Sequence, residues 1–320
     1  MEAYLATQKN AIWVDLNGRG CLELTDRDRL DLVHRMSTND LRRLETGAAM
    51  PTVLTTATGR IIDMLVMIND GERALAITGR GRDEMVRSYL QRHVFFNDRL
   101  KIKDVSGGID LIGVYGARAA SALEKIVPGA AELPVHRFVT VNETIVLRMP
   151  PLAGDGFWLL GSPEKAQALR QNLEQAGVLL ADESTLDLLR IEAGIPEVDH
   201  ELTGDYIPLE AGLWDAVSFN KGCYTGQEII ARMESRGQLA KMLVHLSTAS
   251  PLEPGADLLR DGKSAGTLTS IAAHPDGGYR ALGFVKTASA TVDAILHTAD
   301  GSELAITAIA GSQPRIKQGA

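Results

Sequence analysis

The order of β-rich runs along the chain constrains its fold more than any other sequence feature. Before residue 161, two neighbouring β-rich runs follow each other directly about as often as a predicted helix lies between them. Neighbouring strands with short connections pair antiparallel, whereas a doubly wound parallel sheet needs a helix after nearly every strand. The sequence therefore predicts an α+β protein with mainly antiparallel sheets. The runs cover residues 12–16, 52–56, 61–68, 74–78, 101–105, 111–115, 139–149 and 157–160.

Two helix start signals stand out. Ser162 offers an N-cap, Pro163 fills the first helical position, and Gly177 stops the apolar pattern that follows. Thr25 with Asp28 three residues later resembles a capping box, which predicts a second helix that begins there. Further helices are expected at 82–94, 117–126 and 184–193.

The character of the chain changes near Gly237, where helical periodicity disappears. The runs at 241–246, 267–271, 280–285, 291–296 and 303–309 are separated by Asp-Gly, Gly-Gly and Pro-Gly pairs. This pattern predicts a small C-terminal β-barrel or sandwich. We expect a first region at 1–236, built of two interleaved α+β subdomains, and a barrel domain at 237–320.

Composition limits the partners and the compartment. The chain has 41 acidic and 33 basic residues and a net charge of −8, so no general attraction to nucleic acid or to an anionic membrane is expected. The N-terminus lacks a basic region followed by an apolar one, and we expect a cytoplasmic protein. Its two cysteines, Cys21 and Cys223, have no metal-ligand spacing, so no metal site is expected.

The run KGCYTGQE at 221–228 carries the strongest chemical signal. Gly222 and Gly226 flank a cysteine and a tyrosine, which predicts a tight loop whose backbone approaches something closely. Cys223 is the candidate reactive thiol. In an extended segment Lys221 would share its face and favour the thiolate. The alternative is that Cys223 is a small buried apolar residue. Glu228 and Arg232, four positions apart, fit a helix-surface ion pair.

This run, followed by Ala231-Arg232, resembles the signature of the YgfZ family, folate-binding proteins of iron-sulfur enzyme maintenance that are related to the glycine-cleavage T-protein. The resemblance extends over nearly the whole chain. It includes the segments STND at 37–40, GRIID at 59–63, RIEAGIP at 190–196, PLEAGL at 208–213 and GTLTS at 266–270.

The resemblance implies a T-protein-like folate-binding body, a tetrahydrofolate pocket and a C-terminal barrel. Glu192 stands in the position that resembles the pterin-binding glutamate of T-proteins, where a carboxylate accepts two parallel donors. Its alternative is a solvated glutamate on the last helical turn. Arg232, and more weakly Arg236, are candidate partners of the folate-tail carboxylates. Lys221 joins this cofactor-binding set, and Tyr206 either packs on a ring of the ligand or is a core tyrosine.

The chain departs from T-proteins in two places. T-proteins have two adjacent aspartates after the glycine turn, whereas this chain has Asp63 followed by Met64. Asp63 either lies near the folate N10 position and steers charge during transfer, or ends a strand pairing. T-proteins also lack the Cys-Tyr loop. Asp63 and Cys223 are therefore the two catalytic candidates.

Three functions compete at this point. The first is a tetrahydrofolate-binding protein that supports assembly or repair of iron-sulfur enzymes, with those proteins or their assembly machinery as partners and Cys223 beside the folate pocket. The alternative is a tetrahydrofolate-dependent aminomethyltransferase or demethylase of one-carbon metabolism that uses Asp63. The third is a scaffold for which the pocket is only a ligand site.

Overall fold

The computed structural model describes residues 2–312, apart from the side chain at position 236. The chain forms two compact units. The first contains Met1–Thr52 and Asp63–Leu189, and the second contains Val53–Ile62 and Arg190–Ala320. The predicted boundary at 236/237 coincides with the end of a helix, α7, while the compact units group residues 190–236 with the barrel. The predicted α+β class with antiparallel sheets is confirmed.

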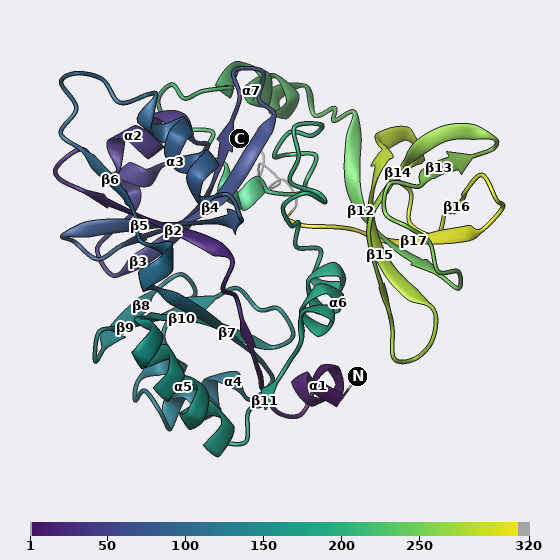
Figure 1. The fold of residues 1–320 in the computed structure, drawn as a ribbon. Helices are drawn as coiled ribbons and strands as arrows, with labels where there is room; N and C mark the ends of the chain where they lie inside the picture. Colours follow the sequence, from purple (N-terminus) through teal and green to yellow (C-terminus); the bar gives the residue numbers. More distant parts are fainter. Residues whose placement is uncertain (1, 313–320) are drawn as a thin grey trace, which may run out of the picture. The chain divides into compact units, whose positions relative to one another are not determined.

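The first unit is built on two sheets (Figure 1). The five-stranded sheet has the order β3-β4-β5-β2-β6, and the six-stranded sheet has the order β11-β1-β7-β10-β9-β8. The recorded pairings are antiparallel except for that of β1 with β11. The strands are β1 (Ile12–Asp15), β2 (Arg19–Thr25), β3 (Ala48–Thr55), β4 (Ile61–Asn69), β5 (Arg73–Arg80), β6 (Lys101–Asp104), β7 (Asp110–Gly116), β8 (Phe138–Val141), β9 (Thr144–Met149), β10 (Asp155–Gly161) and β11 (Leu179–Leu180).

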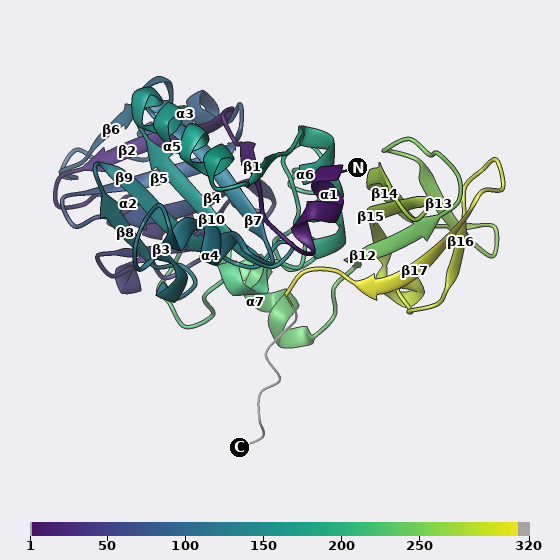
Figure 2. The same cartoon turned by 90° about the horizontal axis from the view of Figure 1, so that it is seen from below.

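The helices are α1 (Glu2–Thr7), α2 (Asp31–Met36), α3 (Asp83–Gln91), α4 (Ala119–Glu124), α5 (Pro163–Gln175), α6 (Glu183–Ala193) and α7 (Gln227–Arg236). Helices α4 and α5 pack on the six-stranded sheet (Figure 2). Their apolar residues, such as Leu123, Leu169 and Leu173, meet Trp13 and Phe157 in one buried cluster. Burial of these side chains accounts for the helical spacing that the sequence showed in this segment.

The two helix start signals had opposite outcomes. Ser162 caps α5 as predicted, since its hydroxyl accepts the backbone N–H of Lys165 at 3.3 Å. The start at Thr25 is wrong, because Thr25 ends β2 and pairs with Arg73 in β5 and Lys101 in β6. Helix α2 begins only at Asp31. Strand pairing on both sides supplies more backbone hydrogen bonds than a capping box offers, so the tertiary context overrides the local signal.

Strand prediction failed where turn chemistry was unusual. The single run at 139–149 is two strands, β8 and β9, because Asn142 and Glu143 turn the chain with positive φ angles of 48° and 65°. No glycine marks this turn, and its one local signal is Asn142, a residue type that tolerates a positive φ. Strand β2 was not predicted at all.

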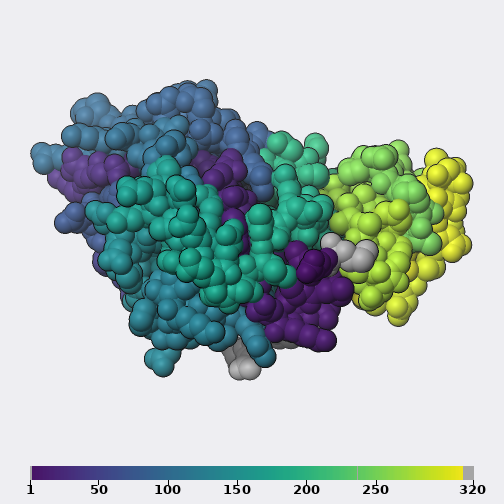
Figure 3. Space-filling view, turned by 60° about the horizontal axis from the view of Figure 1, so that its bottom comes forward, coloured from purple at the N-terminus to yellow at the C-terminus, as the bar shows by residue number. Residues whose placement is uncertain are grey.

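In the second unit the C-terminal strands close into a six-stranded barrel. Figure 1 draws these strands in green to yellow, and the same colours mark the atoms of this part of the chain in the space-filling view of Figure 3. The order is β12-β15-β14-β13-β16-β17, so the barrel alternative is confirmed and the sandwich is not. The sequence missed the short β13 (Asp257–Arg260). The others are β12 (Lys241–Thr248), β14 (Lys263–Ala273), β15 (Tyr279–Lys286), β16 (Ile295–His297) and β17 (Glu303–Ile309). Aliphatic side chains such as Val244, Leu246 and Leu268 fill the interior.

One buried ionic cluster ties the segment after α6 to the barrel. The fully buried carboxylate of Glu201 accepts the Arg190 guanidinium at 3.2 Å and the hydroxyls of Thr269 and Ser270, each at 2.6 Å. The backbone N–H of Glu197 donates to the same carboxylate at 3.1 Å. A buried charge is tolerated when its lone pairs are satisfied in this way.

No helix in the described residues is long and apolar enough to cross a bilayer.

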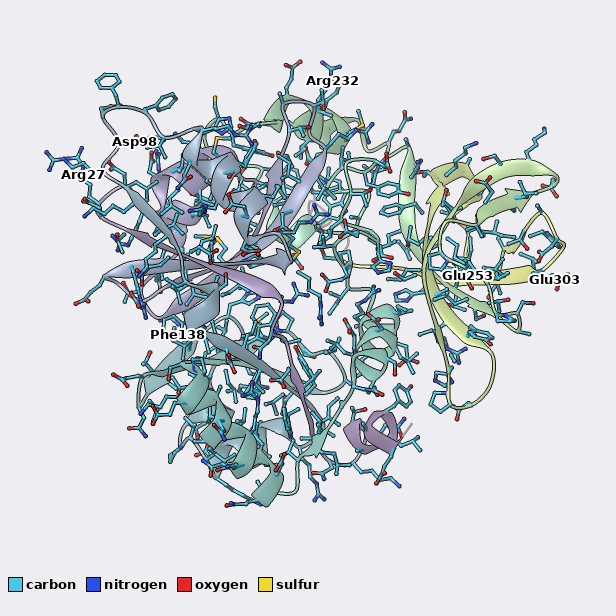
Figure 4. All side chains as sticks on the ribbon, viewed as in Figure 1. Arg27, Asp98, Phe138, Arg232, Glu253 and Glu303 are labelled. Atoms are coloured by element: carbon cyan, nitrogen blue, oxygen red, sulfur yellow. The ribbon has the colours of Figure 1, made fainter. Side chains whose placement is uncertain are left out.

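Replacement of Glu201 by alanine should destabilise the second unit by about 3–5 kcal/mol, since Arg190 would keep a buried charge without its partner. Chemical denaturation followed by circular dichroism measures the change. Glu303→Gln is the control, because Glu303 is exposed on the barrel (Figure 4) and its contact with His297 is 3.6 Å long. Equal midpoints for Glu201→Ala and the control would contradict the assigned role of the cluster.

Candidate functional site

Asp63 is a buried carboxyl on β4 in the first unit. Its Oδ1 accepts the backbone N–H of Met64 at 2.9 Å, and its Oδ2 accepts that of Gly79 at 3.0 Å. Burial raises the pKa of Asp63 to about 6, although the two hydrogen bonds and the positive charges of Arg19 and Arg82 act in the opposite direction. Asp63 therefore ties β4 to the end of β5, and its place near the folate N10 position stays a prediction.

Glu192 lies on the last turn of α6, in the second unit. Its side chain is 28% exposed, and its Oε1 is 3.2 Å from Nε2 of His274. A carboxylate offers about four acceptor sites on its two oxygens. The donor set of a pterin edge, two parallel N–H groups, fits such a group. The structure therefore places Glu192 against a histidine rather than in open solvent.

The end of α6 is fixed by a glycine. Gly194 adopts φ +67°, and the backbone N–H of Ile195 donates to the carbonyl of Arg190 at 2.9 Å, which closes the helix. A Cβ at position 194 would lie 2.9 Å from Nε2 of His245. The predicted end of this helix at residue 193 is confirmed, and the close approach explains why a side chain does not fit at position 194.

The KGCYTGQE loop separates its lysine from its cysteine. Lys221 is buried, with Nζ 4.9 Å from the ring centre of Tyr224, whereas Cys223 is exposed. The shared face expected of an extended segment does not apply, because residues 221–223 belong to no strand and the two side chains lie in different environments. The alternative of a buried Cys223 is wrong as well. The loop instead buries Tyr224 among Ile207, Leu209, Val217 and Ile230.

The close backbone approach predicted for this loop is present within the second unit. Gly226 has φ +85°, and a Cβ on it would lie 2.6 Å from the carbonyl oxygen of Thr56 and 2.9 Å from Cα of Gly59. Thr55 donates its hydroxyl to the carbonyl of Thr225 at 2.6 Å. The glycine is required because the loop packs against the segment Val53–Ile62, and α7 starts from that fixed point.

Arg232 projects from α7 into solvent (Figure 4). It is 46% exposed and donates to Oε1 of Glu228 at 2.8 Å, which is the predicted ion pair. An exposed pair of this kind contributes little to stability, so the guanidinium can exchange Glu228 for another carboxylate at small cost. The weaker candidate Arg236 has its side chain outside the described part of the structure.

Tyr206 is packed as a core tyrosine. Its ring stacks on Phe284 with centres 3.4 Å apart and planes 12° apart, and Nζ of Lys241 is 5.0 Å from its centre. Burial raises the pKa of Tyr206 to about 12. These neighbours favour the core interpretation over a ring-stacking role.

Two histidines near Glu192, His274 and His245, are not among the candidate residues that the sequence motifs indicated. His274 comes from the turn between β14 and β15, and His245 comes from β12. The sequence offered one signal for His274, its place before Pro275-Asp276-Gly277, which marks a tight turn. Nothing in the sequence indicated that this turn approaches Glu192, which is 82 positions away.

Comparison with known proteins decides the family. Residues 2–221 match the family described as the GCVT N-terminal domain. The chain belongs to this family. Its fold is that of an aminomethyltransferase: the structure superposes on the glycine cleavage system aminomethyltransferase T of Bartonella henselae with a TM-score of 0.87, at 22% identity, over 96% of this chain and 88% of that one.

Sequence relatives of this GCVT-family chain include transferases. A protein of Arabidopsis thaliana described as a putative chloroplastic transferase is 30% identical over 297 residues, which cover 91% of this chain and 69% of the relative. An aminomethyltransferase of Nostoc is 27% identical over 303 residues, which cover 90% of this chain and 80% of the relative. The relation to the T-protein that the sequence motifs implied is therefore confirmed.

Asp63 should make the stability of the first unit depend on pH. The folded carboxyl keeps a proton between pH 4 and 6 that the unfolded chain releases, so the free energy of unfolding falls as pH rises through this range. Asp63→Asn should lack this component, and its stability relative to the unsubstituted protein should rise by up to about 3 kcal/mol between pH 4 and 7. Urea titrations at several pH values measure both profiles.

Glu143→Gln is the control, since Glu143 is 87% exposed in the same unit. Parallel profiles for Asp63→Asn and the unsubstituted protein would show that Asp63 titrates normally.

Proposed function

We propose that this chain binds a tetrahydrofolate derivative and transfers a one-carbon group of the aminomethyl type, with Asp63 as its reacting carboxyl. The observation that carries the proposal is a buried carboxyl with a pKa of about 6 in a chain of the GCVT family. The names of the relatives support a transferase, since several are aminomethyltransferases.

The chemistry of Asp63 suits this reaction. With a pKa of about 6, the carboxyl is mostly ionised at pH 7 and is still a better base than an ordinary aspartate. A carboxylate in a buried site also stabilises a positive charge that develops on a substrate amine. Tetrahydrofolate supplies the amine nitrogens that accept the one-carbon group. Asp63 would hold the proton that the amine releases.

Binding would use residues of the second unit. Glu192 has the acceptor capacity for the pterin edge. Arg232 would exchange its surface partner Glu228 for a carboxylate of the folate tail. Lys221 is less suited to contact the ligand, because its ammonium group lies over Tyr224. Tyr206 is already covered by Phe284.

Binding and turnover test the proposal separately. Titration calorimetry with 5-formyl-tetrahydrofolate should show binding, and Glu192→Gln should weaken it at least about tenfold, since a neutral amide accepts less strongly than a carboxylate. Asp63→Asn should bind normally but form methylene-tetrahydrofolate from aminomethyl donors, such as an aminomethyl group on a carrier protein, about 10²–10⁴-fold more slowly. This transfer needs no oxidant, because the carbon keeps its oxidation state and the amino group of the donor leaves as ammonia. The rate of the unsubstituted protein should rise with pH through about 6.

Glu253→Gln is the binding control, because Glu253 is an exposed residue of the barrel (Figure 4). Absence of folate binding would refute the whole proposal. Binding without any methylene product from these donors would refute the transferase part alone.

A second candidate function rests on a different observation, the exposed thiol of Cys223 in the KGCYTGQE loop. This loop resembles the YgfZ signature, and we propose as the alternative that the chain supports assembly or repair of iron-sulfur enzymes in a folate-bound form. In the described residues, no group of three or more histidine, cysteine or acidic side chains is arranged to hold a metal. Cys223 would therefore act as a transient ligand or redox partner, since a cluster needs several ligands.

Cys223→Ala should lower the activity of iron-sulfur enzymes in cells that depend on this protein, while tetrahydrofolate binding stays intact. Thiol labelling provides the biochemical control. Iodoacetamide should modify Cys223 and leave Cys21 unmodified, because Cys21 is buried and its pKa is raised to about 12. Unchanged iron-sulfur enzyme activities with Cys223→Ala would exclude this role for the thiol.

A further inference from the structure

We propose that His274 is a positioning residue, which donates a hydrogen bond from Nε2 to Glu192 and so fixes the orientation of the carboxylate that receives the pterin. The inference rests on the proposed folate-binding role of Glu192. It assigns a function to a turn of the barrel that none of the sequence motifs includes.

The turn holds the backbone of His274 in a defined place. The last residue pair of β14 and β15 is Ala273 with Tyr279, so His274 directly follows a paired strand. Its N–H donates to the carbonyl of Gly278 at 3.0 Å, and its own carbonyl accepts the N–H of Gly277 at 3.0 Å. The imidazole therefore extends from a closed turn rather than from a free loop.

The hydrogen bonds of the ring define its tautomer. The backbone N–H of Asp276 donates to Nδ1 of His274 at 3.1 Å, and a nitrogen that accepts a hydrogen bond carries no proton. In the neutral imidazole the proton is then on Nε2, which is the nitrogen 3.2 Å from Oε1 of Glu192. The carboxylate of Asp276 is 3.9 Å from Nδ1 and 86% exposed, so it is a weak competitor for the ring.

Only 6% of the His274 side chain is exposed, so solvent has little access to this contact. A neutral donor leaves the negative charge of Glu192 in place, whereas a lysine or arginine would neutralise it. The contact with His274 restrains the rotation of the carboxylate before the ligand arrives. Such restraint lowers the conformational cost of binding.

The barrel also fixes the backbone beneath Glu192. His245 on β12 forms a hydrogen bond with the carbonyl of Ile191, and burial lowers the pKa of His245, with the charge of Glu192 acting in the opposite direction. Two histidines of the barrel thus contact this helix end, His274 at the carboxylate of Glu192 and His245 at the adjacent backbone. His245 cannot take the place of His274, because its ring already forms a hydrogen bond with the backbone of Ile191 near the end of α6.

The experiment measures dissociation constants for 5-formyl-tetrahydrofolate by calorimetry. His274→Leu should weaken binding about tenfold, and His274→Gln, whose amide can donate near the position of Nε2, should recover most of the loss. In the Glu192→Gln background, His274→Leu should have no further effect, because it acts through Glu192. The affinity for p-aminobenzoylglutamate, which has no pterin, should be unchanged.

A readout without ligand tests the geometry itself. Nitrogen-15 NMR of the free protein should show His274 protonated at Nε2 and unprotonated at Nδ1. Thermal midpoints of the variants control for folding. A protonated Nδ1 in the neutral ring, an unchanged dissociation constant for His274→Leu, an additive effect in the double variant, or an equal loss for p-aminobenzoylglutamate would each overturn the inference.

The outcomes separate this inference from the proposed function. If the unsubstituted protein does not bind the folate, the proposed function fails and the positioning role falls with it. If Glu192→Gln weakens binding and His274→Leu does not, the proposed function stands and only the role of His274 is wrong.

Discussion

The buried carboxylate of Glu201 is the interaction on which the second unit depends. This carboxylate accepts hydrogen bonds from the guanidinium of Arg190, from a backbone N–H and from two hydroxyls of β14. Arg190 is two residues before Glu192 on α6, so the same cluster that satisfies a buried charge also fixes the helix turn that presents Glu192. Stability and site geometry in this unit therefore have a common source.

The two carboxyls assigned to function differ in their surroundings. Asp63 is buried, accepts two backbone N–H groups and titrates near neutral pH. Glu192 is partly exposed and contacts an imidazole. The first environment suits proton transfer, which needs a pKa near the working pH. In the proposed function Asp63 would therefore handle a proton, and the more exposed Glu192 would recognise the ligand.

The fold was largely predictable, and the wrong helix start at Thr25 has a long-range cause. Antiparallel pairing, the N-cap at Ser162 and the change of character near Gly237 were all visible as patterns within a few residues. The predicted helix start at Thr25 is wrong because Thr25 pairs with two neighbouring strands, β5 and β6. The sequence could show the capping box, but the strands that compete with it come from residues 73 and 101.

The candidate site, too, was predictable from the sequence only in part. The sequence by itself determined the residue types: a lone aspartate before Met64, a glutamate on a helix end at Glu192, and a cysteine between two glycines. Tertiary structure alone decided that Cys223 is exposed while Lys221 is buried, that Tyr206 stacks on Phe284, and that His274 reaches Glu192. The physical reason is that burial, pKa and hydrogen-bond partners depend on residues far away in the chain, whereas turn and helix signals depend on neighbours.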